Sequence, residues 1–293
     1  MPKAKVYFTD ELTPAAVLKM YQAVGKPLTG RVAVKVHSGE KGNQNYLRPE
    51  FMRPMIEQVH GTVVECNTAY DGARNTTAKH RKLLKEHGWA ALYPCDLMDA
   101  EGPDLVLPIP HGKVIKQNYV GKNLANYDSL LVLSHFKGHP MGGFGGALKQ
   151  LSIGIASTAG KAYIHSAGKT TDQFKLWDNL PAQDLFLASM ADAASSVVDY
   201  FHGNAVYINV MCNLSVDCDC CAKAEDPCLP DIGILASTDP VALDQACLDL
   251  VSASTAVGRD HFMERVNSRH GVYTIEAAAA LGIGTRNYDL VRC

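Results

Sequence analysis

Five cysteines lie close together in the last third of this 293-residue sequence, which contains nine cysteines in all. They fall within a 17-residue segment and are Cys212, Cys218, Cys220, Cys221 and Cys228. Thiolates are soft ligands that bind zinc, copper(I) or iron–sulfur clusters in preference to hard cations. A Cys-x-Cys segment can place two thiolates on one side of an extended chain, and Cys228 can fold back to supply a third. The cluster therefore indicates a thiolate metal site.

The spacing of these cysteines leaves the kind of site open. It matches neither the paired Cys-x2-Cys of zinc ribbons nor the Cys-x2-Cys-x2-Cys run of bacterial ferredoxins. Buried free thiols that pack as small hydrophobes are one alternative, and a redox disulfide between Cys220 and Cys221 is another. Acidic residues make the segment polar, which favours metal binding over core packing: Asp217, Asp219, Glu225 and Asp226.

A glycine-rich stretch at residues 134–150 is the second concentration of reactive side chains. Its histidines, His135 and His139, can ligate a metal or act as acid and base near neutral pH, and Lys149 can hold an anion. Glycines let the backbone approach an anion closely, and free N–H groups then bind it; these are Gly142, Gly143, Gly145 and Gly146. The stretch has neither the lysine setting of a P-loop nor the spacing of the dinucleotide fingerprint. A tightly packed turn without a ligand is the alternative.

Three further polar segments follow expected strands, at residues 35–43, 67–75 and 163–169. They contribute Lys35, His37, Glu40, Tyr70, Asp71, Arg74, His165 and Lys169. Ligands of open α/β sheets bind outside the carboxyl ends of the strands. We therefore expect these side chains to converge on one pocket, with Lys169 as a further anion-binding residue.

Strand-like and helix-like segments alternate along the chain and would position these groups. Expected strands cover residues 6–8, 31–37, 61–66, 91–95, 105–109, 130–133 and 205–210. Expected helices cover residues 13–23, 49–60, 76–87, 183–201, 240–252 and 259–269. Residues 130–133 are all apolar, as in strands buried on both faces of a parallel sheet. The pattern predicts an α/β fold: a mostly parallel central sheet flanked by helices, in a single domain over residues 1–293 with a cysteine-rich loop at 212–230 after a late strand.

Composition excludes several classes of protein. The chain has 28 Lys and Arg against 30 Asp and Glu, and 47% of its residues are hydrophobic. This hydrophobic content excludes a disordered chain, and the near-neutral charge argues against sequence-independent nucleic-acid binding. No apolar segment has the length of a signal peptide core or a membrane span. We expect a cytoplasmic protein without nucleic-acid or membrane partners, in which clustered cysteines serve metal or redox chemistry.

Four motifs resemble the family called domain of unknown function 362. They lie at residues 39–43, 68–74, 135–149 and 217–244. Members of that family are often labelled iron–sulfur centre or ferredoxin-like proteins, so the resemblance implies a cluster with Cys218 and Cys220 among its ligands. It does not extend to Cys212, Cys221 or Cys228, and the added ferredoxin segment of many relatives is missing here. Residues 142–149 are also similar to the glycine and lysine stretch of nickel-dependent lactate racemase.

Three functions follow from these observations. The first is an enzyme with a [4Fe–4S] cluster, in which three thiolates leave one iron open as a Lewis acid. There, Lys149 or Lys169 holds a small anionic substrate and His135 or His139 moves protons. The second is an electron carrier that meets a redox partner protein and binds no small molecule. The third is a zinc site, structural or hydrolytic, in the same loop.

Overall fold

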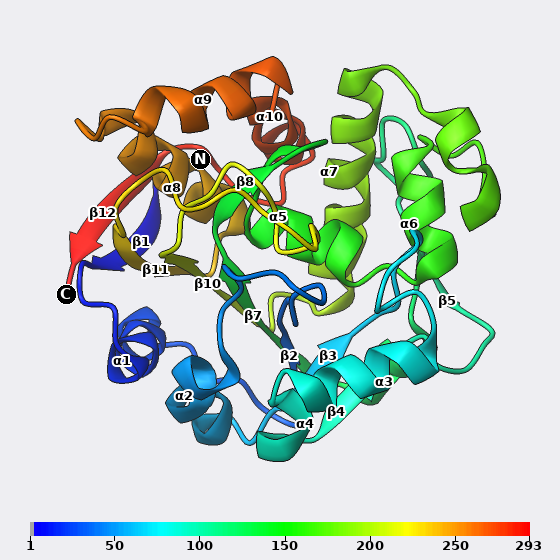
Figure 1. Cartoon of the computed structure of the whole chain (residues 1–293), viewed down its shortest axis with the longest axis horizontal. Helices are drawn as coiled ribbons and strands as arrows, with labels where there is room; N and C mark the ends of the chain where they lie inside the picture. Colours follow the sequence, from blue (N-terminus) through cyan, green and yellow to red (C-terminus); the bar gives the residue numbers. More distant parts are fainter. Residues whose placement is uncertain (1–2) are drawn as a thin grey trace.

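Eight strands form the central sheet of the computed structural model, which describes residues 3–293 (Figure 1). They are β1 (Ala4–Thr9), β2 (Val32–Lys35), β3 (Thr62–Glu65), β4 (Cys95–Leu97), β7 (Ser129–His135), β10 (Ala205–Met211), β11 (Gly233–Ser237) and β12 (Tyr288–Arg292). Their order across the sheet is β12-β1-β11-β10-β7-β2-β3-β4. Within the described residues, only β11 runs antiparallel to its neighbours. The predicted α/β fold with a mostly parallel central sheet is therefore confirmed.

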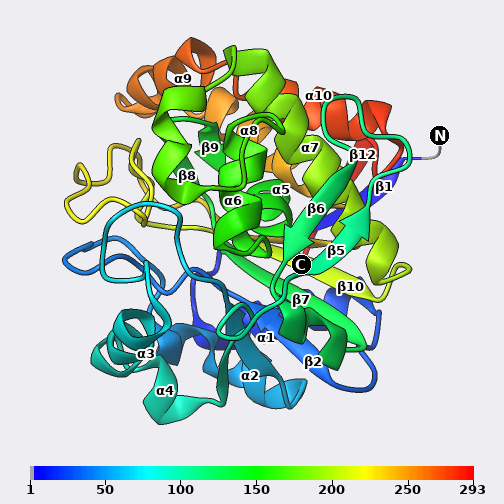
Figure 2. The same cartoon turned by 90° about the vertical axis from the view of Figure 1, so that its right-hand side faces the viewer.

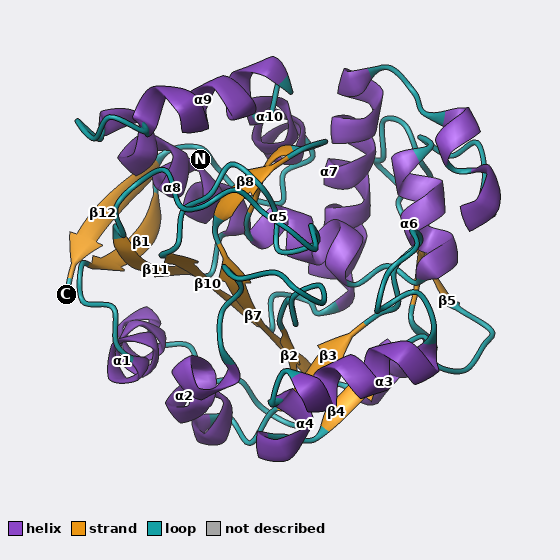
Figure 3. Cartoon of the chain, in the orientation of Figure 1, coloured by secondary structure: helices purple, strands orange, loops and turns teal. Residues whose placement is uncertain are grey.

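Helices cover both faces of this sheet (Figure 3). One face packs against α1 (Pro14–Val24), α2 (Arg53–Gln58), α3 (Thr77–Glu86) and α4 (Trp89–Leu92). On the other side lie α5 (Ala147–Lys149), α6 (Thr158–His165), α7 (Gln183–Tyr200), α8 (Pro240–Ala253), α9 (Arg259–Ser268) and α10 (Val272–Ala280). A π-helical turn, Gln150–Gly154, follows α5, and short 3-10 turns cover Pro49–Met52, Lys122–Asn126, Gln173–Lys175 and Trp177–Asn179.

The strand β7 shows why its sequence is apolar throughout. Leu130 and Val132 belong to the core on one face of the sheet, whereas Leu131 and Leu133 belong to the core on the other. Successive side chains of a strand point to opposite faces, so a strand covered on both sides needs apolar residues at every position. This position in the middle of the sheet places the glycine-rich stretch at the centre of its carboxyl edge.

Helix boundaries follow the capping residues. Thr13 Oγ1 accepts a hydrogen bond from Ala16 N at 3.1 Å, and Pro14 is the first residue of α1. Asp239 caps α8 in the same way, accepting from two backbone N–H groups at 2.9 Å.

Two predicted strands differ in the structure. Residues 91–95 were expected to be extended, but residues 89–92 form α4, and the next strand begins only at Cys95. The spacing of hydrophobic residues in a short apolar run does not distinguish a strand from a buried helical turn. Here the helical turn buries Trp89 completely. The expected strand at 105–109 does form, as β5 (Leu105–Pro108), but pairs with β6 (Gln117–Val120) outside the main sheet.

The chain leaves the carboxyl edge of the sheet at the ends of β2, β3, β7 and β10. After β7 a hairpin of β8 (Lys137–His139) and β9 (Gly143–Gly145) extends beside the cysteine loop (Figure 2). Gly138 N donates a hydrogen bond to Ser215 O at 2.8 Å. A Cβ at residue 138 would lie 2.3 Å from Val216 O, so the loop rests directly on the hairpin backbone.

Within residues 3–293, no helix combines the length and the hydropathy needed to cross a lipid bilayer.

Gly138→Ala tests the packing of the loop on the hairpin. The added methyl group must displace the backbone at Val216, and overpacking of this kind destabilises proteins by about 1–3 kcal/mol. We expect a lower thermal unfolding midpoint by calorimetry. Gly142→Ala is the matched control, because its Cβ would meet its nearest atom at 3.5 Å, an ordinary contact. Equal midpoints for the two variants would contradict the close approach.

Candidate functional site

A cavity of about 400 Å³ lies at the carboxyl edge of the sheet. Side chains from five separate parts of the chain line it. The charged and polar ones among them are Lys35, His37, Glu65, Thr68, Tyr70, Arg74, Lys137, His139, Lys149, Gln150, Lys161, His165 and Cys220. Polar groups that follow different strands thus meet in one space.

The cysteine loop contributes a tight turn to this edge. Cys221 N donates to Cys218 O at 2.9 Å, so residues 218–221 form a turn rather than the extended segment expected from Cys-x-Cys. The Sγ atoms of Cys218 and Cys220 and a ring nitrogen of His139 all lie within 4.8 Å of one another. Cys220 Sγ is 3.8 Å from His139 Nε2. These three side chains form a group that could hold a metal ion.

Asp219 anchors the turn between the two cysteines. Its carboxylate is buried, with Oδ1 2.9 Å from His135 Nδ1 and Oδ2 3.0 Å from Lys137 Nζ. Burial alone would raise the pKa of this carboxyl, but His135 and Lys137 hold it well below its ordinary value. The backbone oxygen of Asp219 also accepts from Glu40 N at 2.8 Å. The turn is thereby tied to the segments after β2 and β7.

Cys218 is fully buried, and Cys220 N donates to its sulfur at 3.4 Å. The sulfur also opposes the effect of burial on the pKa of His37 and His139. Nδ1 of His139 accepts two backbone hydrogen bonds at 2.9 and 3.1 Å, and Nδ1 of His37 accepts one at 3.1 Å. Burial lowers the pKa of both histidines to about 4. Each neutral ring therefore carries its proton on Nε2, facing the sulfur, which suits a thiolate.

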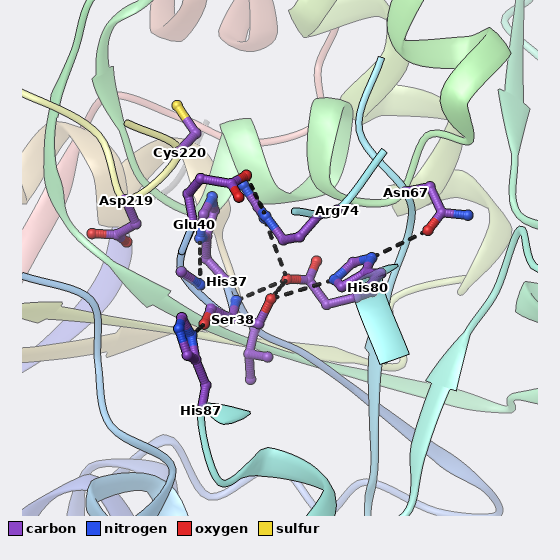
Figure 4. Close-up of polar contacts among 12 residues, drawn as sticks. His37, Ser38, Glu40, Asn67, Arg74, His80, His87, Asp219 and Cys220 are labelled. Carbon is purple, nitrogen blue, oxygen red and sulfur yellow. Dashed lines mark hydrogen bonds and ion pairs between the residues drawn. The ribbon is translucent and has the colours of Figure 1, made fainter. Parts of the chain in front are cut away.

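A buried ionic network lies beneath the cavity. Glu65 accepts from Lys35 Nζ at 2.6 Å and from Ser38 N and Oγ at 2.8 and 2.9 Å. Arg74 Nε pairs with Glu40 Oε2 at 3.2 Å, and its Nη1 is 3.9 Å from Glu65. Figure 4 shows these contacts continuing through Ser38 to His80 and Asn67. Opposing the effect of burial, Lys35 and the other nearby cations lower the pKa of Glu65.

Two lysines of the cavity remain outside this network. Within residues 3–293, neither Lys149 nor Lys161 has a carboxylate within 4.0 Å, whereas Lys35, Lys137 and Arg74 each have at least one. The cavity therefore carries an excess of positive charge, which attracts an anion.

The structure separates the residues predicted for proton transfer and anion binding. His139, Lys149, Gly145 and Gly146 line the cavity. His135 does not, because both of its ring nitrogens are held, one by Asp219 and the other by Cys212 O at 2.6 Å. The remaining predicted anion-binding residues, Gly142, Gly143 and Lys169, also lie outside the lining, and Lys169 is exposed.

Only some of the five cysteines predicted as metal ligands lie together in the structure. Cys218 and Cys220 belong to the group of three, whereas Cys221 does not; its interaction with Cys220 lowers the pKa of the Cys221 thiol. Cys228 points away, donating from Sγ to Leu214 O at 3.4 Å, and burial raises the pKa of Cys212 to about 12. All nine cysteines, which lie within the described residues, are free thiols.

Lys161 and Gln150 are cavity residues that the sequence reasoning missed. Lys161 and His165 are four residues apart in α6, so they share one face of that helix. Ser157 caps α6 by accepting from Gly160 N at 3.1 Å. A serine cap followed by this lysine–histidine spacing was the available signal.

Residues 32–249 match the family described as "Domain of unknown function (DUF362)". The chain belongs to this family. The matched region includes the strand ends and the cysteine turn that form the site, so the resemblance of the sequence motifs is confirmed.

Two solved structures align with most of this chain at low sequence identity. The lactate racemase apoprotein from Thermoanaerobacterium thermosaccharolyticum is 12% identical with a TM-score of 0.46, over 99% of this chain and 82% of that one. A protein from Thermotoga maritima is 11% identical with a TM-score of 0.44, over 93% of this chain and 60% of that one. No protein of curated function matches the sequence significantly.

Four histidines with lowered pKa values predict that the folded protein loses stability in acid. Burial lowers the pKa of His80 to about 3 and that of His37, His139 and His165 to about 4. Histidines of the unfolded chain bind protons near pH 6.5, so below that pH the unfolded state binds more protons than the folded one. The free energy of unfolding should fall between pH 6.5 and pH 4, by up to about 1.4 kcal/mol per pH unit for each histidine.

Urea unfolding at several pH values measures this slope. His80→Gln should make the slope shallower, because one of the four groups is removed. His111→Gln, at an exposed position, is the control and should leave the slope unchanged. A slope in His80→Gln equal to that of the unaltered chain would show that His80 does not contribute.

Proposed function

We propose that this chain is an enzyme in which a thiophilic metal centre, held by Cys218 and Cys220, acts on a small organic anion. The supporting observation is that Cys220 lines the same cavity as Lys149 and Lys161. A centre bound to this thiolate and an anion bound to these lysines would therefore share one space. An electron carrier has no need of a cavity with unpaired lysines, which favours the enzyme.

The residues of the turn fit such a centre. Two thiolates select zinc, copper(I) or iron–sulfur clusters, and N–H groups directed at ligating sulfur tune metal centres. His139 is close enough to ligate, but a ligating histidine normally donates its second N–H outward, whereas Nδ1 of His139 accepts two hydrogen bonds. We therefore assign Cys218 and Cys220 as ligands and His139 as an N–H donor to their sulfur atoms.

A single ion is the form of the centre that the geometry supports best. The two sulfur atoms lie within 4.8 Å of each other, and the ligands of one tetrahedral ion are separated by about 3.3–3.8 Å. A [4Fe–4S] cluster is the second candidate, favoured by the adjacent Cys221 thiol as a third ligand. Either centre, when bound, supplies a Lewis acid to an oxygen of the anion.

Metal analysis of anaerobically purified protein tests this proposal. A single-ion site predicts about one metal equivalent per chain and no acid-labile sulfide, whereas a cluster predicts about four iron and four sulfide. Cys220→Ser should reduce the bound metal several-fold. Cys228→Ser should retain it, because the Cys228 sulfur is directed at Leu214 O.

Two outcomes would contradict the proposed centre. One is a chain that remains free of metal after anaerobic incubation with zinc and, separately, with iron and sulfide. The other is equal metal loss from Cys220→Ser and Cys228→Ser. That result would mean that Cys220 is no more a ligand than Cys228.

A further inference from the structure

Three exposed apolar side chains form a ridge beside the cavity. Phe174 is 85% exposed, Trp177 is 55% exposed and Leu180 is 43% exposed. They are three residues apart along two consecutive 3-10 turns, and Leu176 between the turns also has helical φ and ψ values, −55° and −51°. Side chains at a spacing of three lie above one another on one side of such turns. Adjoining apolar side chains on a surface mark a binding site, whereas single ones are common.

Trp177 joins this apolar ridge to the cavity. It lines the cavity although more than half of it is exposed, and Leu176, which is buried, lines the cavity beside it. The segment that carries the ridge packs against α6 (Figure 1). An apolar surface therefore leads from inside the cavity, across Trp177, to the outside.

Much of the cavity wall is apolar as well. In addition to Leu176 and Trp177, it includes Ala69, Pro140, Met141 and Ile153. Apolar walls with a few polar groups that fix orientation are typical of small-molecule sites. The wall and the ridge thus suit one apolar body that extends through the opening.

The glycine-rich stretch supplies a charged end to the same cavity. A Cβ at Gly145 would lie 3.4 Å from Lys149 Cδ and 3.5 Å from Lys137 Cε, so both lysine side chains pass beside this glycine. Lys137 pairs with Asp219 at 3.0 Å. Among residues 3–293, Lys149 Nζ has neither a carboxylate within 4.0 Å nor a hydrogen-bond partner, and Lys161 donates only to a backbone oxygen. The ammonium group of Lys149 is therefore available to an anion.

We infer that the cavity binds an amphipathic organic anion, with its charged end at Lys149 and an apolar tail that leaves the cavity along Trp177 and Phe174. The cationic groups of the cavity select a negative head group, and the apolar ridge covers a tail that extends beyond the cavity. An anion without a tail would use the charged end alone and leave the ridge in water. This inference rests on the proposed function and names the substrate class of that site.

Calorimetric titration with unbranched carboxylates tests the binding of the tail. Acetate, hexanoate and decanoate have the same charged end and differ only in tail length. The affinity should rise by about two- to fourfold for each added methylene. Hexanol lacks the charge of hexanoate and should bind about tenfold more weakly, and hexylammonium, which reverses the charge, should bind more weakly still. The metal content of the same preparation is measured in parallel.

Variants assign the tail to the ridge. Trp177→Ser and Phe174→Ser should each weaken decanoate binding about threefold and leave acetate binding unchanged, because only the tail reaches these residues. Lys149→Met keeps an apolar side chain but removes the charge, so it should weaken all three carboxylates about tenfold. Val257→Ser is the matched control: Val257 is 99% exposed and outside the cavity lining, so decanoate should bind as before.

Tryptophan fluorescence reports the position of the tail directly. The chain has two tryptophans, of which Trp89 is fully buried and Trp177 is exposed at the opening. Decanoate should shift the emission to shorter wavelength as its tail covers Trp177, whereas acetate should not. Trp177→Phe should lose this shift.

The outcomes separate this inference from the proposed function. Absence of carboxylate binding, equal affinity for the three carboxylates, or a tail-length dependence that persists in both serine variants overturns the amphipathic site, even when the metal is present. Self-association or vesicle binding that Phe174→Ser abolishes, without an effect on decanoate, assigns the ridge to a second copy or a membrane surface and also overturns it. The expected tail dependence in a chain that cannot be loaded with metal supports the amphipathic site and contradicts the metal centre.

Discussion

The site depends on the buried carboxylate of Asp219. It is 1% exposed and pairs with His135, the last residue of β7, and with Lys137, the first residue of β8. A buried charge without partners is strongly unfavourable, so these contacts hold the turn in one position. Because Asp219 lies between Cys218 and Cys220, the same contacts place the Cys220 thiol at the cavity and the buried Cys218 thiol next to it, both close to His139.

Charge pairing then determines what the cavity can bind. Three buried acids at this edge are each matched by a cation: Asp219 by Lys137, Glu65 by Lys35 and Glu40 by Arg74. Lys149 and Lys161 line the same cavity and have no carboxylate within 4.0 Å in the described part of the chain. Thiolates, free cations and paired polar groups therefore meet at one end of a rigid parallel sheet, where α/β proteins bind ligands.

The sequence predicted the fold better than the individual site residues. The apolar run of β7 and the caps at Thr13 and Asp239 are local signals, and parallel strands bring their following loops to one edge. His135 and His139 look equivalent in sequence, but only the fold shows that Asp219 and Cys212 O occupy the first. Likewise, nothing in the spacing of five cysteines reveals that Cys228 turns toward Leu214, since that depends on the path of the loop across the hairpin.

X-ray absorption at the edge of the bound metal tests the central claim most directly, because it reports the atoms around the metal. Anaerobically prepared protein should show sulfur neighbours at about 2.3 Å. Addition of a small organic anion such as acetate should change the shell of lighter atoms and leave the sulfur shell intact, since the proposed anion meets the metal within the cavity. A metal surrounded only by nitrogen and oxygen would contradict the assignment of Cys218 and Cys220 as its ligands.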